Sequence, residues 1–150
     1  MRQMKAEAGI TITAEALRDI EEEAGRAFPA EACGILLAEA GEQKICGLRV
    51  LENRIKGEEA ERFFKIEPLK LYRAELEAEK GQRKIIGFFH SHTEAEAVLS
   101  ETDESYMIPG MLYLILSLKE QGPGRLRAYI KDDPDSPARE VSVETAEAQI

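Results

Sequence analysis

The sequence predicts an α+β fold in which strands and helices share one compact layered arrangement. Two segments carry apolar residues at helical spacing, and several apolar runs have the length of buried strands. These elements do not alternate as regular strand–helix–strand units, so a mixed sheet is expected. No repeat, low-complexity tract or linker divides the chain, and we expect a single domain over residues 1–150.

The first third of the chain predicts a strand, a helix and a strand hairpin. Residues 9–12 have the pattern of a short strand, and Thr13 is placed to cap the helix that follows. Residues 33–38 form an apolar run that is too short for a helix and suits a buried strand. A glycine-containing turn at 41–42 then leads into a strand at 45–51.

A second helix and the centre of the sheet are expected in the middle of the chain. Pro68 suits the first turn of a helix, where its missing N–H costs little. The buried stripe of this helix is expected to consist of Leu69, Tyr72 and Leu76. Residues 84–89 form a continuous apolar run that is typical of a central strand. The other expected elements are strands at 63–66, 112–118 and 125–131, a short helix from Ser100, and a turn at 122–124.

Composition and charge exclude several classes of protein. The 29 acidic and 20 basic residues give a formal net charge of −9, which repels nucleic acid. This acidic surface serves solubility or the docking of a partner, and composition does not separate the two. No apolar run reaches the length of a membrane span, and the first residues lack the apolar stretch of a secretory signal. Because the only cysteines are Cys33 and Cys46, we expect reduced thiols and a cytoplasmic location.

The two histidines of the chain, His90 and His92, follow directly after the predicted central strand. In an extended chain, residues i and i+2 point to the same side, with Cα atoms about 6–7 Å apart. Two imidazoles at this spacing can converge on one zinc ion, whose bonds to nitrogen are about 2.0–2.1 Å long. The alternative is a pair of unrelated histidines at a strand end, one of them hydrogen-bonded, and the two-residue pattern alone does not decide.

A catalytic zinc ion needs a third protein ligand and one open coordination position. Ser100 and Asp103 also have the spacing of a capping box, in which both residues would only begin a helix. Spacing alone does not separate these two roles. The acidic candidates downstream of the histidines are Glu94, Glu96, Glu101, Asp103 and Glu104.

The pattern His90-Ser91-His92, seven residues, Ser100, two residues, Asp103 has the full spacing of the JAMM, or MPN-plus, zinc metallopeptidase motif. The chain resembles this family over residues 8–145. The resemblance implies a three-layer, α/β/α-like α+β fold of the cytidine-deaminase-like kind, with a mixed, curved β-sheet flanked by helices. Cytidine deaminase chemistry itself is excluded, because the Pro-Cys-x-x-Cys element is absent. Further positions that resemble the family are residues 28–36, Asn53, residues 64–68 and Gly87.

The resemblance also implies a role for each motif residue. His90, His92 and Asp103 would bind Zn²⁺, with water as the fourth ligand. Glu31 would be the general base, and Ser100 would donate a hydrogen bond to the oxyanion. Without the resemblance, Glu31 would be one acid among many, facing solvent after a Pro-Ala turn.

Two residues near the motif need separate interpretation. Cys33 could be the nucleophile of a Cys–His hydrolase, but Ser100 and Asp103 would then have no purpose. Its apolar strand favours core packing instead. Thr93 stands where family members usually have proline, so the loop over residues 93–99 is expected to be less constrained.

The short chain looks most like the compact prokaryotic family members that act on ubiquitin-like sulfur-carrier proteins. This resemblance implies hydrolysis of the peptide or isopeptide bond after the carrier's C-terminal Gly-Gly. The product would be an amino acid such as cysteine, or a C-terminal extension. Two alternatives stay open: removal of a ubiquitin-like modifier from protein lysines, and a non-catalytic MPN scaffold that binds partner proteins. A homodimer is compatible with the sequence.

Overall fold

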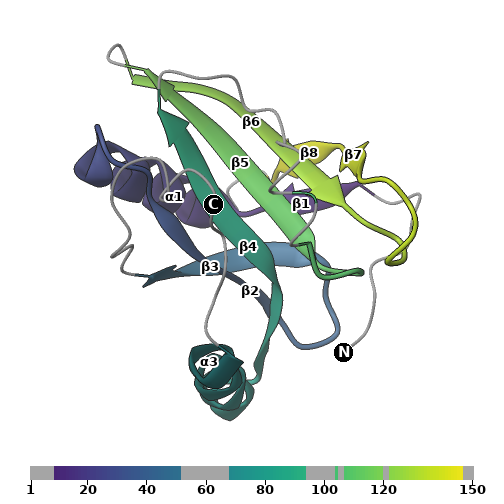
Figure 1. The fold of residues 1–150 in the computed structure, drawn as a ribbon. Helices are drawn as coiled ribbons and strands as arrows, with labels where there is room; N and C mark the ends of the chain where they lie inside the picture. The colour runs from purple at the N-terminus through teal and green to yellow at the C-terminus, as the bar shows by residue number, and fades with distance from the viewer. Residues whose placement is uncertain (1–8, 52–67, 94–103, 105–106, 120–121, 147–150) are drawn as a thin grey trace.

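The structure is a computed structural model that describes residues 9–51, 68–93, 104, 107–119 and 122–146. Within these residues the chain forms eight strands and two helices (Figure 1). Their bounds are β1 Ile10–Ile12, α1 Ala14–Ala27, β2 Cys33–Glu39, β3 Lys44–Leu51, α3 Pro68–Lys80, β4 Arg83–Thr93, β5 Leu112–Lys119, β6 Gly122–Ile130, β7 Arg139–Val141 and β8 Val143–Thr145.

All eight strands belong to one mixed sheet, with the order β7-β6-β5-β4-β2-β3-β1-β8. Strand β4 is parallel to β5, and β1 is parallel to both β3 and β8, whereas the other neighbouring pairs are antiparallel. The predicted mixed sheet is therefore confirmed. The apolar run that was expected at the sheet centre lies in β4, between β2 and β5.

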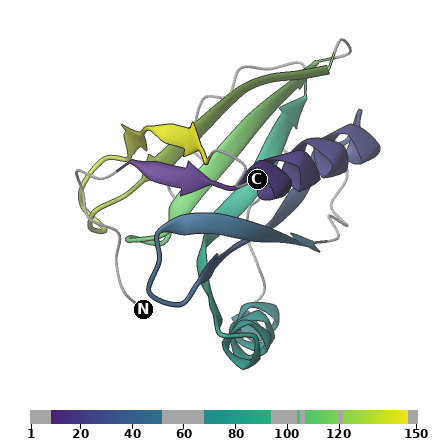
Figure 2. The same ribbon diagram turned by 180° about the vertical axis from the view of Figure 1, so that it is seen from behind.

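The sheet separates two hydrophobic clusters, each covered by one helix. On one face, α1 contributes Ile20 and Ala24 to a cluster that includes Phe89 of β4. On the other face, Ala74 of α3 packs with Phe88 and other residues of the sheet. Successive strand residues point to opposite faces, which explains why neighbouring phenylalanines belong to different clusters. Views from opposite sides show the same layering, with α1 behind the sheet in Figure 1 and in front of it in Figure 2. The predicted α+β fold with helices flanking the sheet is confirmed.

Thr13 caps α1 as predicted. Its Oγ1 accepts a hydrogen bond of 3.1 Å from the Ala16 N–H, one of the donors that an uncapped helix leaves without a partner. The apolar positions Ala16, Ile20 and Ala24 are buried against the sheet. The helix ends at Ala27, and Phe28 and Pro29 follow it.

The predicted buried stripe of α3 is wrong. Leu69, Tyr72 and Leu76 are 52%, 57% and 41% exposed, whereas Ala74 and Ala78 face the sheet and are 3% and 7% exposed. Small side chains allow the helix backbone to lie close to the sheet. The helix has apolar residues on both sides, so its periodicity does not identify which side is buried.

Two local predictions also need correction, and two strands were missed. The predicted turn at 122–124 belongs to β6, where Gly122 pairs with Lys119. Thr93 is the last residue of β4 and pairs with Leu118, so it belongs to the strand and not to the predicted loop. The short strands β7 and β8 were not predicted, because three residues are too few to show a pattern.

Several predictions fall on residues outside the described part of the chain. These are the strand at 63–66, the stretch 64–68 except for Pro68, Asn53, the loop over 94–99, and the start of the helix at Ser100. Among the described residues, no helix combines the length and apolar character that a membrane span requires.

Strands β4 and β5 approach each other closely at Gly87. A Cβ atom at this position would lie 2.1 Å from the carbonyl oxygen of Leu112, the residue that pairs with Gly87. Because the contact is with backbone, the strand itself would have to move. His90 lies three residues further along β4, so a shift of this ladder would also disturb the histidines.

We expect Gly87→Ala to lower the free energy of unfolding by about 1–3 kcal/mol or more, as overpacking of a tight site does. Gly25→Ala is the matched control, because a Cβ atom there meets no heavy atom within 4 Å and Gly25 lies inside α1. This control should raise stability by about 0.5–1 kcal/mol. Urea denaturation of both variants measures the two effects, and a Gly87→Ala protein as stable as the wild type would contradict the close approach.

Candidate active site

The two histidines lie near the end of the central strand, and their side chains approach each other. Their Nε2 atoms are 2.9 Å apart, and the centroids of the rings are 4.8 Å apart. His90 is buried, with 7% exposure, and His92 is half-buried. The strand alternation predicted from the sequence therefore places both imidazoles on one face of β4.

The Nε2–Nε2 distance can be compared with that of a zinc site. Two nitrogens bound to one tetrahedral zinc ion at 2.0–2.1 Å are about 3.3 Å apart. The observed 2.9 Å is within a few tenths of an ångström of this value, so small rotations of the rings would suffice. The same distance also suits a hydrogen bond from one imidazole to the other. The pair of nitrogens thus fits a zinc ion without excluding a simple hydrogen-bonded pair.

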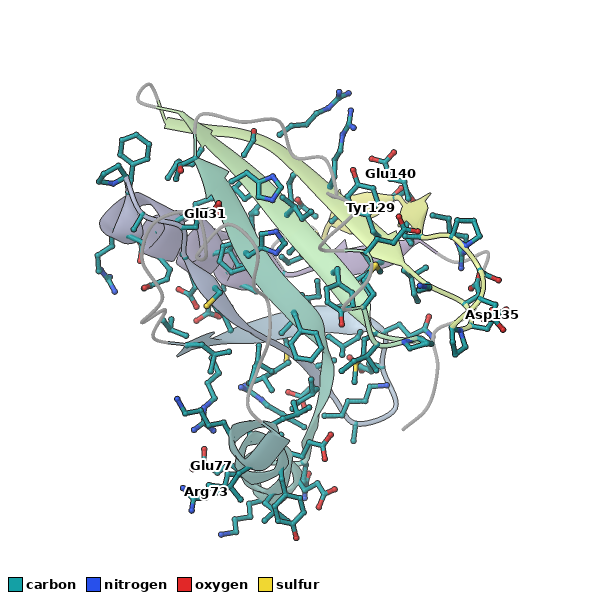
Figure 3. All side chains as sticks on the ribbon, in the orientation of Figure 1. Glu31, Arg73, Glu77, Tyr129, Asp135 and Glu140 are labelled. Atoms are coloured by element: carbon teal, nitrogen blue, oxygen red, sulfur yellow. The ribbon has the colours of Figure 1, made fainter. Side chains whose placement is uncertain are left out.

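Glu31 is held near the histidines by the chain segment that leads into β2. The Ala32 N–H donates a hydrogen bond of 2.8 Å to the Ser91 Oγ, and the Ser91 N–H donates one of 3.0 Å to the Ala32 carbonyl oxygen. The next residue, Cys33, pairs with His90 across the β2–β4 ladder. Figure 3 shows Glu31, which is partly buried, beside the half of β4 that carries the histidines.

Ser91, which lies between the two histidines, has a structural role. It is fully buried, with 0% exposure, and points to the face opposite the imidazoles. Its two hydrogen bonds join the backbone before Cys33 to β4. The sequence carries no signal for the partner, Ala32, because that residue contributes only backbone atoms.

Cys33 does not have the properties of an activated nucleophile. Burial and, to a smaller extent, the negative charges of Glu23 and Glu31 together raise the pKa of its thiol to about 11. A nucleophilic cysteine instead needs a lowered pKa, so that the thiolate is present near neutral pH. The Sγ atom lies 3.6 Å from the carbonyl oxygen of Leu51. These observations favour the structural interpretation of Cys33 over a Cys–His hydrolase.

The third predicted zinc ligand, Asp103, and the predicted oxyanion donor, Ser100, lie outside the described residues. Within the described part of the chain, no three His, Cys, Asp or Glu side chains gather as a ligand set. One rival for the third position has another partner: the Glu104 Oε1 accepts a hydrogen bond of 2.8 Å from the Ala138 N–H. The assignment of Asp103 and Ser100 stays a prediction.

Comparison with solved structures defines the class of protein to which this fold and site belong. AF2198 from Archaeoglobus fulgidus, a JAB1/MPN domain protein, has a TM-score of 0.60 and 19% identity, covering 93% of this chain and 99% of that one. A second structure, that of JAMM, a metalloprotease-like zinc site in the proteasome and signalosome, has a TM-score of 0.56 and 18% identity, with coverage of 93% and 100%. The fold is that of a JAB1/MPN domain.

The sequence also places the chain in a particular family. The family of prokaryotic homologs of the JAB domain matches residues 13–129, and the chain belongs to this family. The protein DSY2949 from Desulfitobacterium hafniense is similar over 93% of this chain and 94% of its own, with 27% identity and a TM-score of 0.73. The curated proteins contain no match to the chain. The resemblance inferred from the histidine motif is therefore confirmed at the level of the family.

Proposed function

We propose that the chain is a cytoplasmic zinc-dependent peptidase in which His90, His92 and Asp103 hold the metal. The observation that carries the proposal is the convergence of the two Nε2 atoms, 2.9 Å apart, beside the segment that holds Glu31. The zinc site named for one structural relative is consistent with this proposal. At 18% identity, however, that relative supports the fold alone, so the argument depends on the residues of this chain.

The proposed reaction assigns one task to each polar side chain. A bound zinc ion would acidify the attacking water and stabilise negative charge on the substrate carbonyl. Glu31 takes a proton from the attacking water and later delivers it to the leaving amine. Ser100 donates a hydrogen bond to the oxyanion. Ser91 takes no part in the chemistry and holds the Glu31 segment against β4 through the Ala32 backbone.

The proposed substrate is a ubiquitin-like sulfur-carrier protein, cleaved after its C-terminal Gly-Gly with release of an amino acid such as cysteine or of a C-terminal extension. Support comes from the resemblance of this short chain to compact prokaryotic members of the family. A narrow groove that admits no side chain beside the scissile bond would explain the requirement for glycine. Deconjugation of a ubiquitin-like modifier from protein lysines is the second candidate, because the same chemistry acts on an isopeptide bond.

The test uses the zinc-equilibrated protein and a carrier whose Gly-Gly end is extended by cysteine. Mass spectrometry of the carrier should show loss of the added residue, and a chelator should abolish this loss. Faster cleavage of a carrier–lysine isopeptide would favour deconjugation instead. If the carriers stay intact while zinc is bound to the protein, the proposed substrate is wrong. A protein that retains no zinc would favour the non-catalytic scaffold.

We expect Ser91→Ala to lower both stability and turnover. The buried Ala32 N–H loses its acceptor, which should lower the free energy of unfolding by about 1–3 kcal/mol. The segment that carries Glu31 then loses one of its two hydrogen bonds to β4, so kcat should fall more than KM changes.

Tyr113→Phe is the matched control for Ser91→Ala. It removes the hydroxyl that accepts a hydrogen bond of 2.7 Å from the Ile108 N–H, in a part of the fold that does not hold Glu31. Urea denaturation and steady-state kinetics of both variants separate the two effects. Equal losses of kcat in both would show that Ser91 acts through general stability alone.

A further inference from the structure

Strand β6 carries two arginines and no acid, although the chain as a whole has a formal net charge of −9. Leu126 of this strand packs in the cluster beneath α1, which also contains Phe89, the neighbour of His90. Side chains alternate along a strand, so both Leu126 and Phe89 point away from the face that carries the histidines. Arg125 and Arg127 lie on either side of Leu126 and therefore share the face of the histidines.

The strand pairing places these arginines two strands away from the histidines. Ser117 of β5 pairs with His92, and the Ser117 Oγ accepts a hydrogen bond of 2.8 Å from the Arg125 N–H. Arg125 thus lies in the same row of the sheet as His92, with β5 between them. Neighbouring strands are about 4.8 Å apart, so the Cα atoms of these two residues are about 10 Å apart. Arg127 lies in the next row, that of His90.

The two arginines differ in their partners. The Arg127 Nε lies 3.4 Å from the Glu140 Oε1, so this guanidinium is drawn toward β7 at the edge of the sheet. Arg125 is exposed, and it forms no ion pair with another residue of the described part of the chain. Arg125 is therefore the cation of this face that can bind an anion from solution.

The opposite side of the histidines is acidic. Glu31 precedes β2, which neighbours β4 on the side away from β5 and β6. The charges of Glu31 and Glu23 both act on the thiol of Cys33, which pairs with His90. A carboxylate would be repelled on this side and attracted on the side of Arg125. The charges thus favour one direction across the site for an anionic group of the substrate.

We propose that Arg125 binds the C-terminal carboxylate of the amino acid that the peptidase releases from its carrier. This inference rests on the proposed function, and it selects the release of a single residue over deconjugation from lysine. The carboxylate of a single leaving residue lies about 3.5 Å beyond the scissile carbonyl, which places it between β4 and β6. A guanidinium binds a carboxylate through two parallel hydrogen bonds, whereas an isopeptide has only the uncharged lysine stem at this place.

Binding of short peptides tests this assignment without turnover. The probes are acetyl-Gly-Gly-Ala with a free carboxylate and the same peptide as a C-terminal amide, with alanine in place of cysteine so that no thiol binds zinc. Each is titrated into zinc-equilibrated Glu31→Gln protein and followed by NMR. The acid should bind about tenfold more tightly than the amide, the lower end for a hydrogen bond to a charged group, because Arg125 is exposed.

Adding Arg125→Gln to this protein should abolish the preference for the acid and leave binding of the amide unchanged. Arg18→Gln is the matched control, because Arg18 is also exposed but lies on α1, on the other face of the sheet, and its loss should keep the preference. If the acid does not bind more tightly than the amide, the proposal is overturned. A preference that survives Arg125→Gln, as direct binding of the carboxylate to zinc would produce, also overturns it.

Kinetics with a carrier extended by alanine distinguishes failure of this inference from failure of the proposed function. In the otherwise wild-type protein, Arg125→Gln should lower kcat/KM for this carrier about tenfold, mainly by raising KM. If no carrier is cleaved but the peptide acid still binds through Arg125, the proposed reaction is wrong and the carboxylate site stands. If the wild-type protein cleaves the acid and amide forms of the carrier equally well, the role of Arg125 is wrong and the peptidase stands.

Discussion

Replacing Glu31 by glutamine should lower turnover by about 10²–10⁴-fold, the usual contribution of a positioned general acid–base group. Glutamine has nearly the same shape as glutamate but cannot take up a proton at neutral pH. The hydrogen bonds that hold this segment involve the backbone of Ala32, so they should survive the substitution. Zinc content should therefore stay at the wild-type level while cleavage of the carrier is lost.

Glu23→Gln is the matched control for this experiment. Glu23 also lies close enough to Cys33 to raise the pKa of its thiol, but its carboxylate pairs with Arg26 of the same helix at 3.0 Å. Turnover should be unchanged in this variant. If Glu31→Gln retains turnover, or if both variants lose it equally, Glu31 is not the general base. If Glu31→Gln loses zinc as well, the assignment of Glu31 as a base that does not bind the metal is wrong.

The elements that were predicted correctly depend on local signals. Thr13 caps α1 through an atom three residues away in the chain, and Pro68 begins α3 where a missing N–H is tolerated. The uninterrupted apolar run of β4 indicated burial on both faces, and the structure places it at the sheet centre. Such signals are complete within a few residues, so a single sequence suffices to interpret them.

The incorrect predictions depend on contacts between distant residues. The sequence of α3 does not indicate that its alanines face the sheet in place of Leu69, Tyr72 and Leu76. Which side of the helix is buried depends on the space beside β4. Strands β7 and β8 exist because β6 and β1 supply partners for them. The larger side chains of α3 are therefore surface residues, contrary to the prediction from periodicity.

The candidate site combines both kinds of information. The two-residue spacing of His90 and His92 is local, and strand geometry converts it directly into the approach of their side chains. Glu31 lies 59 residues before His90, and only the pairing of β2 with β4 brings its segment to the histidines. From the sequence, that residue could be chosen only through resemblance to a family. The structure adds the physical connection, through Ala32 and Ser91.

Replacing His92 or Asp103 by alanine should weaken zinc binding by more than about 100-fold, since even the loss of an outer-shell partner costs 10–100-fold. Each substitution removes one of three proposed protein ligands, and two ligands with water hold zinc poorly. Zinc content, measured by mass spectrometry of the metal after equilibration with a zinc buffer, should fall well below one ion per chain. The wild-type protein should retain about one zinc ion, removable by a chelator.

Glu104→Ala provides the control that makes the zinc experiment specific for Asp103. Glu104 is the neighbouring acid and was a candidate for the same role, but its carboxylate accepts a hydrogen bond from the Ala138 N–H. Its removal should lower the free energy of unfolding by about 1–3 kcal/mol and leave zinc bound. The opposite result, zinc lost from Glu104→Ala and kept by Asp103→Ala, would assign the third ligand to Glu104. Asp103 would then have only the helix-capping role that its spacing from Ser100 also predicts.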